Sequence, residues 1–204
     1  MDKAADLDMA VSIAVDSKTQ NVSVCNAMET LLVHRNVAEA YLPMLLPALQ
    51  AKNVKLLGDE VTQAIIPVLP ATEEDWSTEY LDYTLSIKVV DSLDEAIGHI
   101  NRYGSGHTDC IVTTDEAAAQ AFLTRVDSAG VYHNVSTRFA DGFVYGFGAE
   151  VGIATGKIHA RGPMGLEGLT TYKYKLLGNG HLLAEMKNGT RQYTHKLLNE
   201  DCPL

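Results

Sequence analysis

The sequence predicts an α/β fold in which a mostly parallel sheet carries helices on both faces. Between residues 84 and 135, strand-like and helix-like segments alternate as strand, helix, strand, helix, strand. The connections are short, so each strand–helix–strand unit closes as a right-handed crossover and its strands run parallel. A chain of 204 residues, 46% of them apolar, suits one domain of this class, or one domain with an appendage.

The first expected helix spans residues 4–18, and its apolar residues recur at the spacing of one helical face. These residues are Leu7, Ala10, Val11, Ala14 and Val15. The apolar run at residues 31–33 then predicts a short buried strand. A second helix is expected over residues 37–51, weakened or kinked by Pro43 and Pro47, because proline lacks the N–H that a helix interior uses.

A strand is expected over residues 53–57, and residues 61–76 predict a connection with at most a short helix. From residue 84 the pattern becomes regular. The expected strands are 84–90, 108–112 and 130–135, and the expected helices are 93–103 and 116–126. Asp91 with Ser92, and Asp115, precede these two helices and supply the side-chain oxygens that cap helix N-termini.

The C-terminal part has a different character. Residues 136–168 are crowded with glycine, and a long glycine-rich segment beyond a parallel sheet is typical of a functional loop. Residues 170–177 alternate weakly and predict an exposed or edge strand. The tail that follows is polar, and we expect it to be only partly ordered.

Charge and cysteine content narrow the function classes. The net charge of −10 argues against general nucleic-acid binding, because a protein that follows phosphates needs a positive face. Cys25, Cys110 and Cys202 lie far apart without CxxC spacing, which argues against a disulfide framework or a metal site and fits the reducing cytoplasm. No apolar run approaches a membrane span and no signal peptide is expected, so we expect no membrane partner.

Residues 146–151, GFGAEV, come nearest to a glycine-rich phosphate-binding fingerprint. They lack its third glycine and follow no expected strand. The chain is therefore expected to have no dinucleotide-binding unit of its own. A serine nucleophile elbow and a histidine pair at zinc spacing are also missing from the sequence.

Cys25 lies at the junction between the first helix and the first strand. A cysteine there can stand at a sheet edge, where nearby backbone N–H groups lower its pKa and hold a developing oxyanion. The alternative is a small buried apolar residue, which is the usual role of a free cysteine. The residue pattern alone favours the second interpretation.

Several motifs in one order resemble those of the γ-glutamyl phosphate reductases, or glutamate-5-semialdehyde dehydrogenases. Residues 23–34, SVCNAMETLLVH, resemble the active-site cysteine segment of that family, and residues 96–111 resemble its signature. STRF at 136–139, GAEVGI at 148–153 and HARGPMGLEGL at 159–169 look like its C-terminal motifs. The tail is more similar to the reductase half of the bifunctional pyrroline-5-carboxylate synthases.

The resemblance implies the aldehyde dehydrogenase fold, which combines a cofactor domain, a catalytic domain and a small oligomerisation element. It places the cysteine-bearing catalytic domain at residues 1–169, an oligomerisation strand that builds a homo-oligomer at 170–178, and a polar tail at 179–204. The cofactor domain, which precedes the cysteine in the family, is expected to be absent from this chain.

The resemblance also implies the reaction, an NADPH-dependent reduction of L-glutamyl 5-phosphate to L-glutamate 5-semialdehyde on the route to proline. Cys25 then becomes the expected nucleophile, which expels phosphate and holds the acyl group as a thioester. Its backbone N–H is a candidate oxyanion donor, whereas Asn26 is expected to orient the loop. Without a cofactor domain, we expect no turnover from this chain alone.

The implied substrate-binding residues are Ser136, Thr137, Arg138, Gly148 and Ala149. The first three follow an expected strand end, where α/β sheets bind ligands. Arg138 suits a bidentate contact to the substrate carboxylate, and the alternative is an ion pair with a neighbour such as Asp141. The glycine and alanine would let backbone N–H groups approach the same carboxylate, or form a simple turn.

Glu79 matches the glutamate that holds the nicotinamide ribose in aldehyde dehydrogenases, and the alternative is a solvated acid. Arg161 is expected to fix the glycine-rich segment, with a phosphate contact as the alternative. His107 is expected to pack at a strand start. Cys110 is expected in the core, and Cys202 is expected to be incidental.

Two other function classes stay open. A cysteine hydrolase or acyltransferase would activate Cys25 through His34 or His133, and requires an imidazole within hydrogen-bond reach of the sulfur. Otherwise both histidines are expected to be structural. A non-catalytic fragment would use residues 170–177 to pair with another subunit. If the chain comes from a eukaryotic bifunctional enzyme, the mitochondrion replaces the cytoplasm as its expected location.

Overall fold

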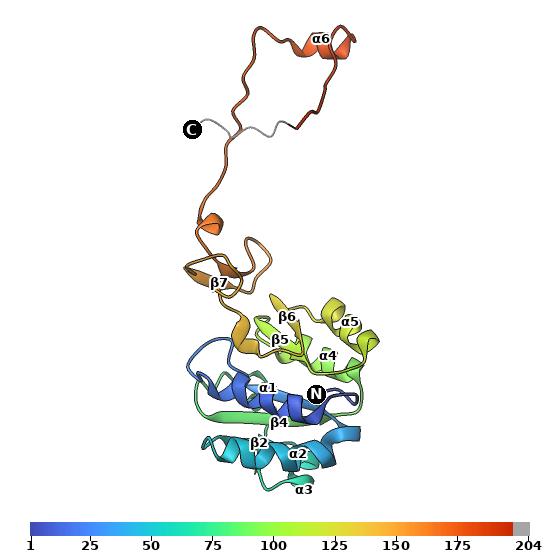
Figure 1. The fold of residues 1–204 in the computed structure, drawn as a ribbon, viewed down its shortest axis with the longest axis vertical. Helices are drawn as coiled ribbons and strands as arrows, with labels where there is room; N and C mark the ends of the chain where they lie inside the picture. Colours follow the sequence, from blue (N-terminus) through green and yellow to red (C-terminus); the bar gives the residue numbers. More distant parts are fainter. Residues whose placement is uncertain (198–204) are drawn as a thin grey trace. The chain divides into compact units, whose positions relative to one another are not determined.

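A four-stranded parallel sheet organises the larger part of the computed structural model, which describes residues 1–197 (Figure 1). Its strand order is β1 (Thr30–His34), β4 (Thr84–Val90), β2 (Lys55–Gly58) and β3 (Leu69–Pro70). Every neighbouring pair is parallel, in agreement with the mostly parallel sheet that the sequence predicted. The described chain divides into two units, Met1–Thr170 and the residues from Thr171 on.

One face of this sheet carries the main core. The alternating strand residues Leu31, Val33, Leu85, Ile87 and Val89 are buried there against α1 (Leu7–Thr19) and α2 (Arg35–Gln50). The Tyr41 hydroxyl of α2 is fully buried and donates a 3.1 Å hydrogen bond to the Ala10 carbonyl of α1. This contact fixes the two helices against one another. The helix α2 continues through Pro43 and Pro47.

The elements that follow β4 form a second group with a core of their own. Helix α4 (Leu93–Tyr103) follows β4, and α5 (Glu116–Arg125) lies between β5 (Thr108–Ile111) and β6 (Gly130–His133). These two strands form a separate parallel pair, visible with α4 and α5 in Figure 1. Ile97, Ile111, Phe122 and Val126 form the second core, which joins these elements. The expected arrangement with helices on both faces is confirmed.

Local chemistry explains where these helices begin. The Ser92 hydroxyl accepts a hydrogen bond from Glu95 N at the start of α4, and the Asp115 carboxylate accepts from Ala117 N and Ala118 N at the start of α5. Each cap satisfies backbone donors that a helix leaves free at its first turn. Both caps were predicted from the sequence.

The remaining elements are short. They are α3 (Glu60–Ile65), the 3-10 turns η1 (Glu74–Ser77), η2 (Thr137–Phe139) and η3 (Glu167–Leu169), strands β7 (Gly152–Ala154) and β8 (Gly162–Met164), and α6 (Leu183–Lys187). Strands β7 and β8 pair antiparallel. The prediction of a strandless glycine-rich loop over 136–168 was therefore wrong at this hairpin, whose strands are too short to show an alternating pattern.

Within residues 1–197 the structure forms neither helix nor strand at residues 170–178, so the oligomerisation strand expected there stays a prediction. A strand exists only where its backbone pairs with another strand, and residues 1–197 provide no partner strand for this segment. Of the expected tail, residues 198–204, which include Cys202, lie outside the described residues. Within residues 1–197, no helix combines the length and apolar character needed to cross a membrane.

We expect Leu45→Ala to lower the free energy of unfolding by about 3 kcal/mol, because it empties a fully buried core position. Met44→Ala on the same helix is the matched control, since that side chain is 39% exposed, and its cost should stay below about 0.5 kcal/mol. Urea unfolding followed by circular dichroism measures both. Equal losses for the two variants would contradict the assignment of this core.

Candidate active site

The Cys25 loop, which we define as residues 20–28, leads from the end of α1 to the start of β1. Cys25 is exposed in it, and the following turn is closed by a 3.0 Å hydrogen bond from Ala27 N to Val24 O. The sequence interpretation of Cys25 as a buried apolar residue is therefore wrong. The sulfur is accessible at the carboxyl end of α1.

An ion pair joins the two ends of the Cys25 loop. Lys18 Nζ, which is fully buried, lies 2.6 Å from Glu29 Oε2, whose side chain is 15% exposed. Beside it, Met28 N donates a 2.9 Å hydrogen bond to Ser17 O. Glu29 O accepts from Ser86 N at 3.1 Å, which anchors the end of the loop to β4. The loop is thus closed at its base.

Buried hydrogen bonds attach the loop to the turn that follows β6, residues 136–140. Thr137 Oγ1 donates to Asn26 O at 2.7 Å, and Asn26 Nδ2 donates to Ala140 O at 2.9 Å. Ser17 Oγ donates to Ser136 Oγ and accepts from Thr137 N, both at 3.2 Å. The expectation that Asn26 orients the loop agrees with these contacts, although its buried Oδ1 has no partner among the described residues.

Arg138 extends from this turn beside the Cys25 loop. Its Nε donates a 2.8 Å hydrogen bond to Gln20 Oε1. No ion pair joins it to Asp141 within residues 1–197, so the alternative of a pair with that neighbour is not realised. The guanidinium lies close enough to Cys25 for its charge to lower the pKa of the thiol.

Several groups set the pKa of Cys25, which is raised overall. Partial burial of the sulfur is the largest cause, and a backbone hydrogen bond within Cys25 opposes it. The carboxylates of Glu150 and Glu79 raise the pKa further, and Arg138 lowers it. At neutral pH the thiol is therefore mainly protonated in this chain. Glu79 and Glu150 lie near the sulfur, although they come from segments far apart in the sequence.

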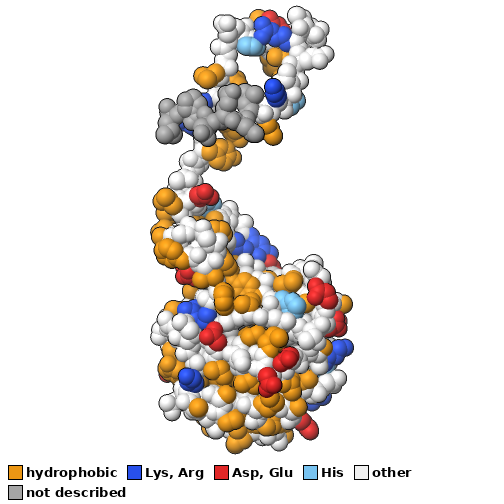
Figure 2. All heavy atoms as spheres, in the orientation of Figure 1, with side chains coloured by type: hydrophobic (Ala, Val, Ile, Leu, Met, Phe, Trp, Pro, Cys, Tyr) orange, Lys and Arg blue, Asp and Glu red, His pale blue; other side chains and the backbone are white. Residues whose placement is uncertain are grey.

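Gly148 and Ala149 directly precede Glu150, whose carboxylate lies near Cys25. Gly148 has φ of +78°, a left-handed conformation that glycine adopts without strain. Glu150 Oε2 accepts a 3.1 Å hydrogen bond from Gly142 N, which closes the loop on itself. Phe143, Val144, Phe147 and Val151 are exposed around it. Figure 2 shows apolar side chains gathered over the part of this unit that contains β7.

The histidines are engaged elsewhere. His34 Nδ1 accepts from Asn36 N at the start of α2, and His133 Nε2 lies 3.0 Å from Thr113 O. No histidine hydrogen-bonds to Cys25 within residues 1–197. A histidine-activated hydrolase would need such a histidine, so this requirement is not met there. His107 is packed at the start of β5, as expected, with Nδ1 2.7 Å from Thr108 Oγ1.

Two further expectations can be compared with the structure. Arg161 Nη1 lies 2.9 Å from Asp127 Oδ1, while Nε donates to Thr155 O, so this arginine fixes the glycine-rich segment as predicted. Cys110 on β5 is only partly exposed, and burial raises the pKa of its thiol. The part of the chain that the structure describes holds no cluster of metal-ligating side chains.

The sequence analysis missed five residues of this site: Ser17, Lys18, Gln20, Glu29 and Glu150. The opposite charges that flank the Cys25 loop were the available signal for the ion pair at its base. The sequence contained no comparable signal for Gln20 or Glu150. Their roles depend on contacts between segments more than 100 residues apart.

The chain is similar to known proteins both in sequence and in structure. No family model matches the chain. Over all 204 residues it is 62% identical to the γ-glutamyl phosphate reductase of Acetivibrio thermocellus, and it covers 47% of that protein. The crystal structure of γ-glutamyl phosphate reductase from Thermotoga maritima matches with a TM-score of 0.86 at 49% identity, over 89% of this chain and 44% of that chain.

A more distant match defines the fold alone. Lactaldehyde dehydrogenase from Escherichia coli matches with a TM-score of 0.54 at 21% identity, over 66% of this chain and 38% of that chain. The chain therefore has an aldehyde dehydrogenase fold, as the sequence motifs implied. It spans about half the length of the curated relatives that it matches.

We expect Lys18→Met to lower the free energy of unfolding by about 3 kcal/mol, because it leaves the Glu29 carboxylate buried without its cation. Arg125→Ala is the control, since its 2.6 Å pair with Asp94 is exposed and is worth at most about 1 kcal/mol. Urea unfolding at pH 7 measures both losses. If the two variants lost the same stability, the ion pair at the loop base would have no special role.

We expect Glu150→Gln to lower the pKa of Cys25, because it removes a negative charge near the sulfur and keeps an oxygen for the bond from Gly142 N. Alkylation of Cys25 by iodoacetamide at pH 7.5 should then accelerate, because the thiolate is the reactive form of the cysteine. Peptide mapping by mass spectrometry separates Cys25 from the other cysteines. Glu39→Gln on α2 is the control, and an unchanged rate in both variants would refute the electrostatic assignment.

Proposed function

Because the chain belongs by sequence to the γ-glutamyl phosphate reductase family, we propose that the complete protein reduces L-glutamyl 5-phosphate to L-glutamate 5-semialdehyde in proline biosynthesis. The observation that carries the proposal is the exposed sulfur of Cys25, held by hydrogen bonds beside the turn that presents Arg138. In this proposal Cys25 is the nucleophile, and Arg138, which is hydrogen-bonded to Gln20 of the Cys25 loop, is the cation for the substrate carboxylate.

In the proposed reaction, the Cys25 thiolate attacks the carbonyl carbon of the acyl phosphate. A carbon–sulfur bond forms, the carbon–oxygen bond to phosphate breaks, and the acyl group remains on the sulfur as a thioester. The thiol must first lose its proton, and Arg138 is the nearby charge that favours the thiolate. The backbone N–H of Cys25 is the donor that we assign to the developing oxyanion.

The substrate head is assigned to the turn after β6. The Nε of Arg138 is bonded to Gln20, which leaves the terminal nitrogens of its planar fork for a carboxylate. Ser136 and Thr137 use their hydroxyls to hold the turn, so their proposed part is to position Arg138 and line the site. Gly148 and Ala149 complete the proposed set through backbone N–H groups.

Glu79 is the residue of this chain that we assign to the nicotinamide cofactor. Its carboxylate is exposed, makes no hydrogen bond within residues 1–197 and lies near Cys25, which suits an acceptor for ribose hydroxyls. NADPH would supply the hydride that takes the thioester to the aldehyde level. We assign the rest of its binding surface to the half of the family's length that this chain does not span.

The proposal includes a homo-oligomer formed through residues 170–178. Tyr172, Tyr174 and Leu176 recur at every second position and are at least 78% exposed, which is the pattern of an edge strand that could pair with another strand.

The free thiols of Cys25 and Cys110 suit a reducing compartment such as the cytoplasm. No observation favours the histidine-activated hydrolase over the reductase.

We expect residues 1–204 alone to bind NADPH weakly and to show no turnover with the acyl phosphate. In the complete protein, Cys25→Ala should abolish turnover and leave the circular dichroism spectrum and NADPH affinity unchanged, because the nucleophile is lost and the fold is not. Cys110→Ala is the control and should retain activity. Turnover by Cys25→Ala would exclude the thioester route, and turnover by the 204-residue chain would show that no further domain is required.

A further inference from the structure

Glu29 lies where the Cys25 loop meets the segment that carries Glu79. Its carboxylate uses both oxygens. Oε2 lies 2.6 Å from Lys18 Nζ, and Oε1 accepts a 3.3 Å hydrogen bond from Leu81 N. Lys18 belongs to α1, whereas Leu81 belongs to the connection between β3 and β4. One side chain therefore joins the base of the loop to a segment about 50 residues further along the chain.

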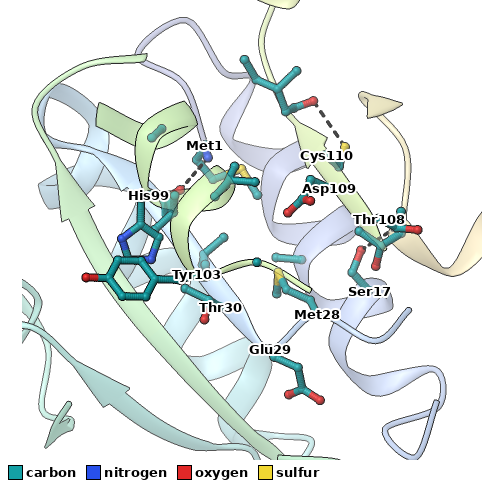
Figure 3. Close-up of a pocket in the computed structure, with 18 of the residues that line it drawn as sticks. Met1, Ser17, Met28, Glu29, Thr30, His99, Tyr103, Thr108, Asp109 and Cys110 are labelled. Atoms are coloured by element: carbon teal, nitrogen blue, oxygen red, sulfur yellow. Dashed lines mark hydrogen bonds between the residues drawn. The ribbon is translucent and has the colours of Figure 1, made fainter. Parts of the chain in front are cut away.

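The backbone of Glu29 is held in place by β4. Glu29 O accepts hydrogen bonds from Ser86 N and from Ser86 Oγ, both at 3.1 Å, and Ser86 is fully buried. In Figure 3 the Glu29 carboxylate points away from Asp109 and Cys110 on β5. Because buried hydrogen bonds are costly to break singly, the carboxylate is presented to Leu81 from a fixed position.

Local hydrogen bonds hold the connection, residues 71–83, on both sides of Glu79. Before it, Thr78 Oγ1 donates to Glu74 O at 2.8 Å. After it, the Tyr80 hydroxyl donates to Asp75 Oδ1, also at 2.8 Å. These bonds shape the connection internally, and its attachment to the loop is made by the residue that follows Tyr80.

That residue, Leu81, has an unusual backbone conformation. Its φ is +50°, in the left-handed region that a bulky side chain rarely adopts. The side chain is 49% exposed, so core packing does not account for the conformation. A strained residue persists only where surrounding contacts hold it, and such residues are typical of active sites and ligand clamps. The hydrogen bond from Leu81 N to Glu29 is such a contact.

Electrostatics show that Glu29, Glu79 and Cys25 are near one another. Burial is the main cause that raises the pKa of Glu29, and the charge of Glu79 raises it further. The charge of Glu79 also raises the pKa of Cys25. Since the two carboxylates repel each other, the attraction that keeps them close comes from other groups. The ammonium group of Lys18 and the N–H of Leu81 supply it.

We propose that Glu29 is a positioning residue, which holds the Glu79 segment against the base of the Cys25 loop. The inference rests on the proposed function, in which Cys25 carries the acyl group and Glu79 accepts from the nicotinamide ribose. Hydride transfer requires these two groups at a fixed spacing. Glu29 follows Cys25 by four residues and bonds to the backbone two residues after Glu79, so it connects the nucleophile to the cofactor contact.

The test compares two double variants of the complete protein, Lys18→Met/Glu29→Gln and Lys18→Met/Glu29→Met. Both remove the two charges of the buried ion pair together, so neither leaves an unpaired charge. Glutamine and methionine have similar length, but only glutamine keeps an oxygen that can accept from Leu81 N. The comparison therefore isolates one hydrogen bond.

We expect the methionine variant to bind NADPH about fivefold more weakly than the glutamine variant, which is the effect of one lost hydrogen bond. Titration of NADPH fluorescence measures both affinities. Alkylation of Cys25 by iodoacetamide should proceed at the same rate in the two variants, because the loop keeps its bond from Met28 N to Ser17 O. Equal NADPH affinities would overturn the proposal, and so would a difference in alkylation alone.

Adding Glu79→Gln to each double variant shows whether Glu29 acts through Glu79. The difference in NADPH affinity should disappear, because a ribose contact that is already lost cannot be displaced further. An undiminished difference would mean that Glu29 stabilises the fold in general, which would overturn the positioning role. Glu29→Asp replaces the methionine variant if that variant does not fold. Its carboxylate is shorter by a methylene, so NADPH affinity should fall, and an unchanged affinity would overturn the proposal.

Failure of the proposed function gives a different result. If Glu79→Gln by itself leaves the NADPH affinity of the complete protein unchanged, the cofactor assignment of Glu79 is wrong and the inference falls with it. If Glu79→Gln weakens NADPH binding while the two double variants bind NADPH equally, the positioning role of Glu29 alone is wrong.

Discussion

Buried hydrogen bonds between the Cys25 loop and the turn after β6 are the interaction on which the candidate site depends. Ser17, Asn26, Ser136 and Thr137 are all buried there, and they connect the end of α1, the loop and the turn. In a low-dielectric surrounding such bonds are costly to break singly, because each partner would be left unsatisfied. Together these bonds hold the Cys25 loop against the turn that carries Arg138.

Electrostatics around Cys25 favour its protonated form. Burial and the carboxylates of Glu150 and Glu79 raise the pKa of Cys25, and Arg138 offsets them only in part. An activated cysteine usually lies in an electropositive surrounding. The chain covers 47% of the γ-glutamyl phosphate reductase of Acetivibrio thermocellus.

The two parallel sheets are joined near one end by the first residues of the chain. Met1 hydrogen-bonds to β1, and Asp2 N donates to Val112 O just beyond β5. A cavity lies beside these contacts, and polar side chains such as Glu29, His99 and Asp109 line it together with apolar ones.

The sequence by itself determined the helices and strands. Helix and strand periods, capping residues and glycines set the local backbone conformation through a few neighbouring residues. It predicted β4 and α4 with their observed ends and the caps Ser92 and Asp115. Motif resemblance implied that Cys25 is the nucleophile, whereas the usual role of a free cysteine had favoured a buried apolar position. The same motifs implied the resemblance to the γ-glutamyl phosphate reductases, to one of which the chain is 62% identical.

Only the tertiary structure decided which distant groups meet. It paired Arg138 with Gln20 instead of Asp141, closed the Cys25 loop with Lys18 and Glu29, and placed Glu150 near the sulfur. It also left residues 170–178 without the strand that their alternation predicted. These outcomes depend on contacts between segments far apart in the chain, or on a partner outside it, and no local pattern of side chains encodes such contacts.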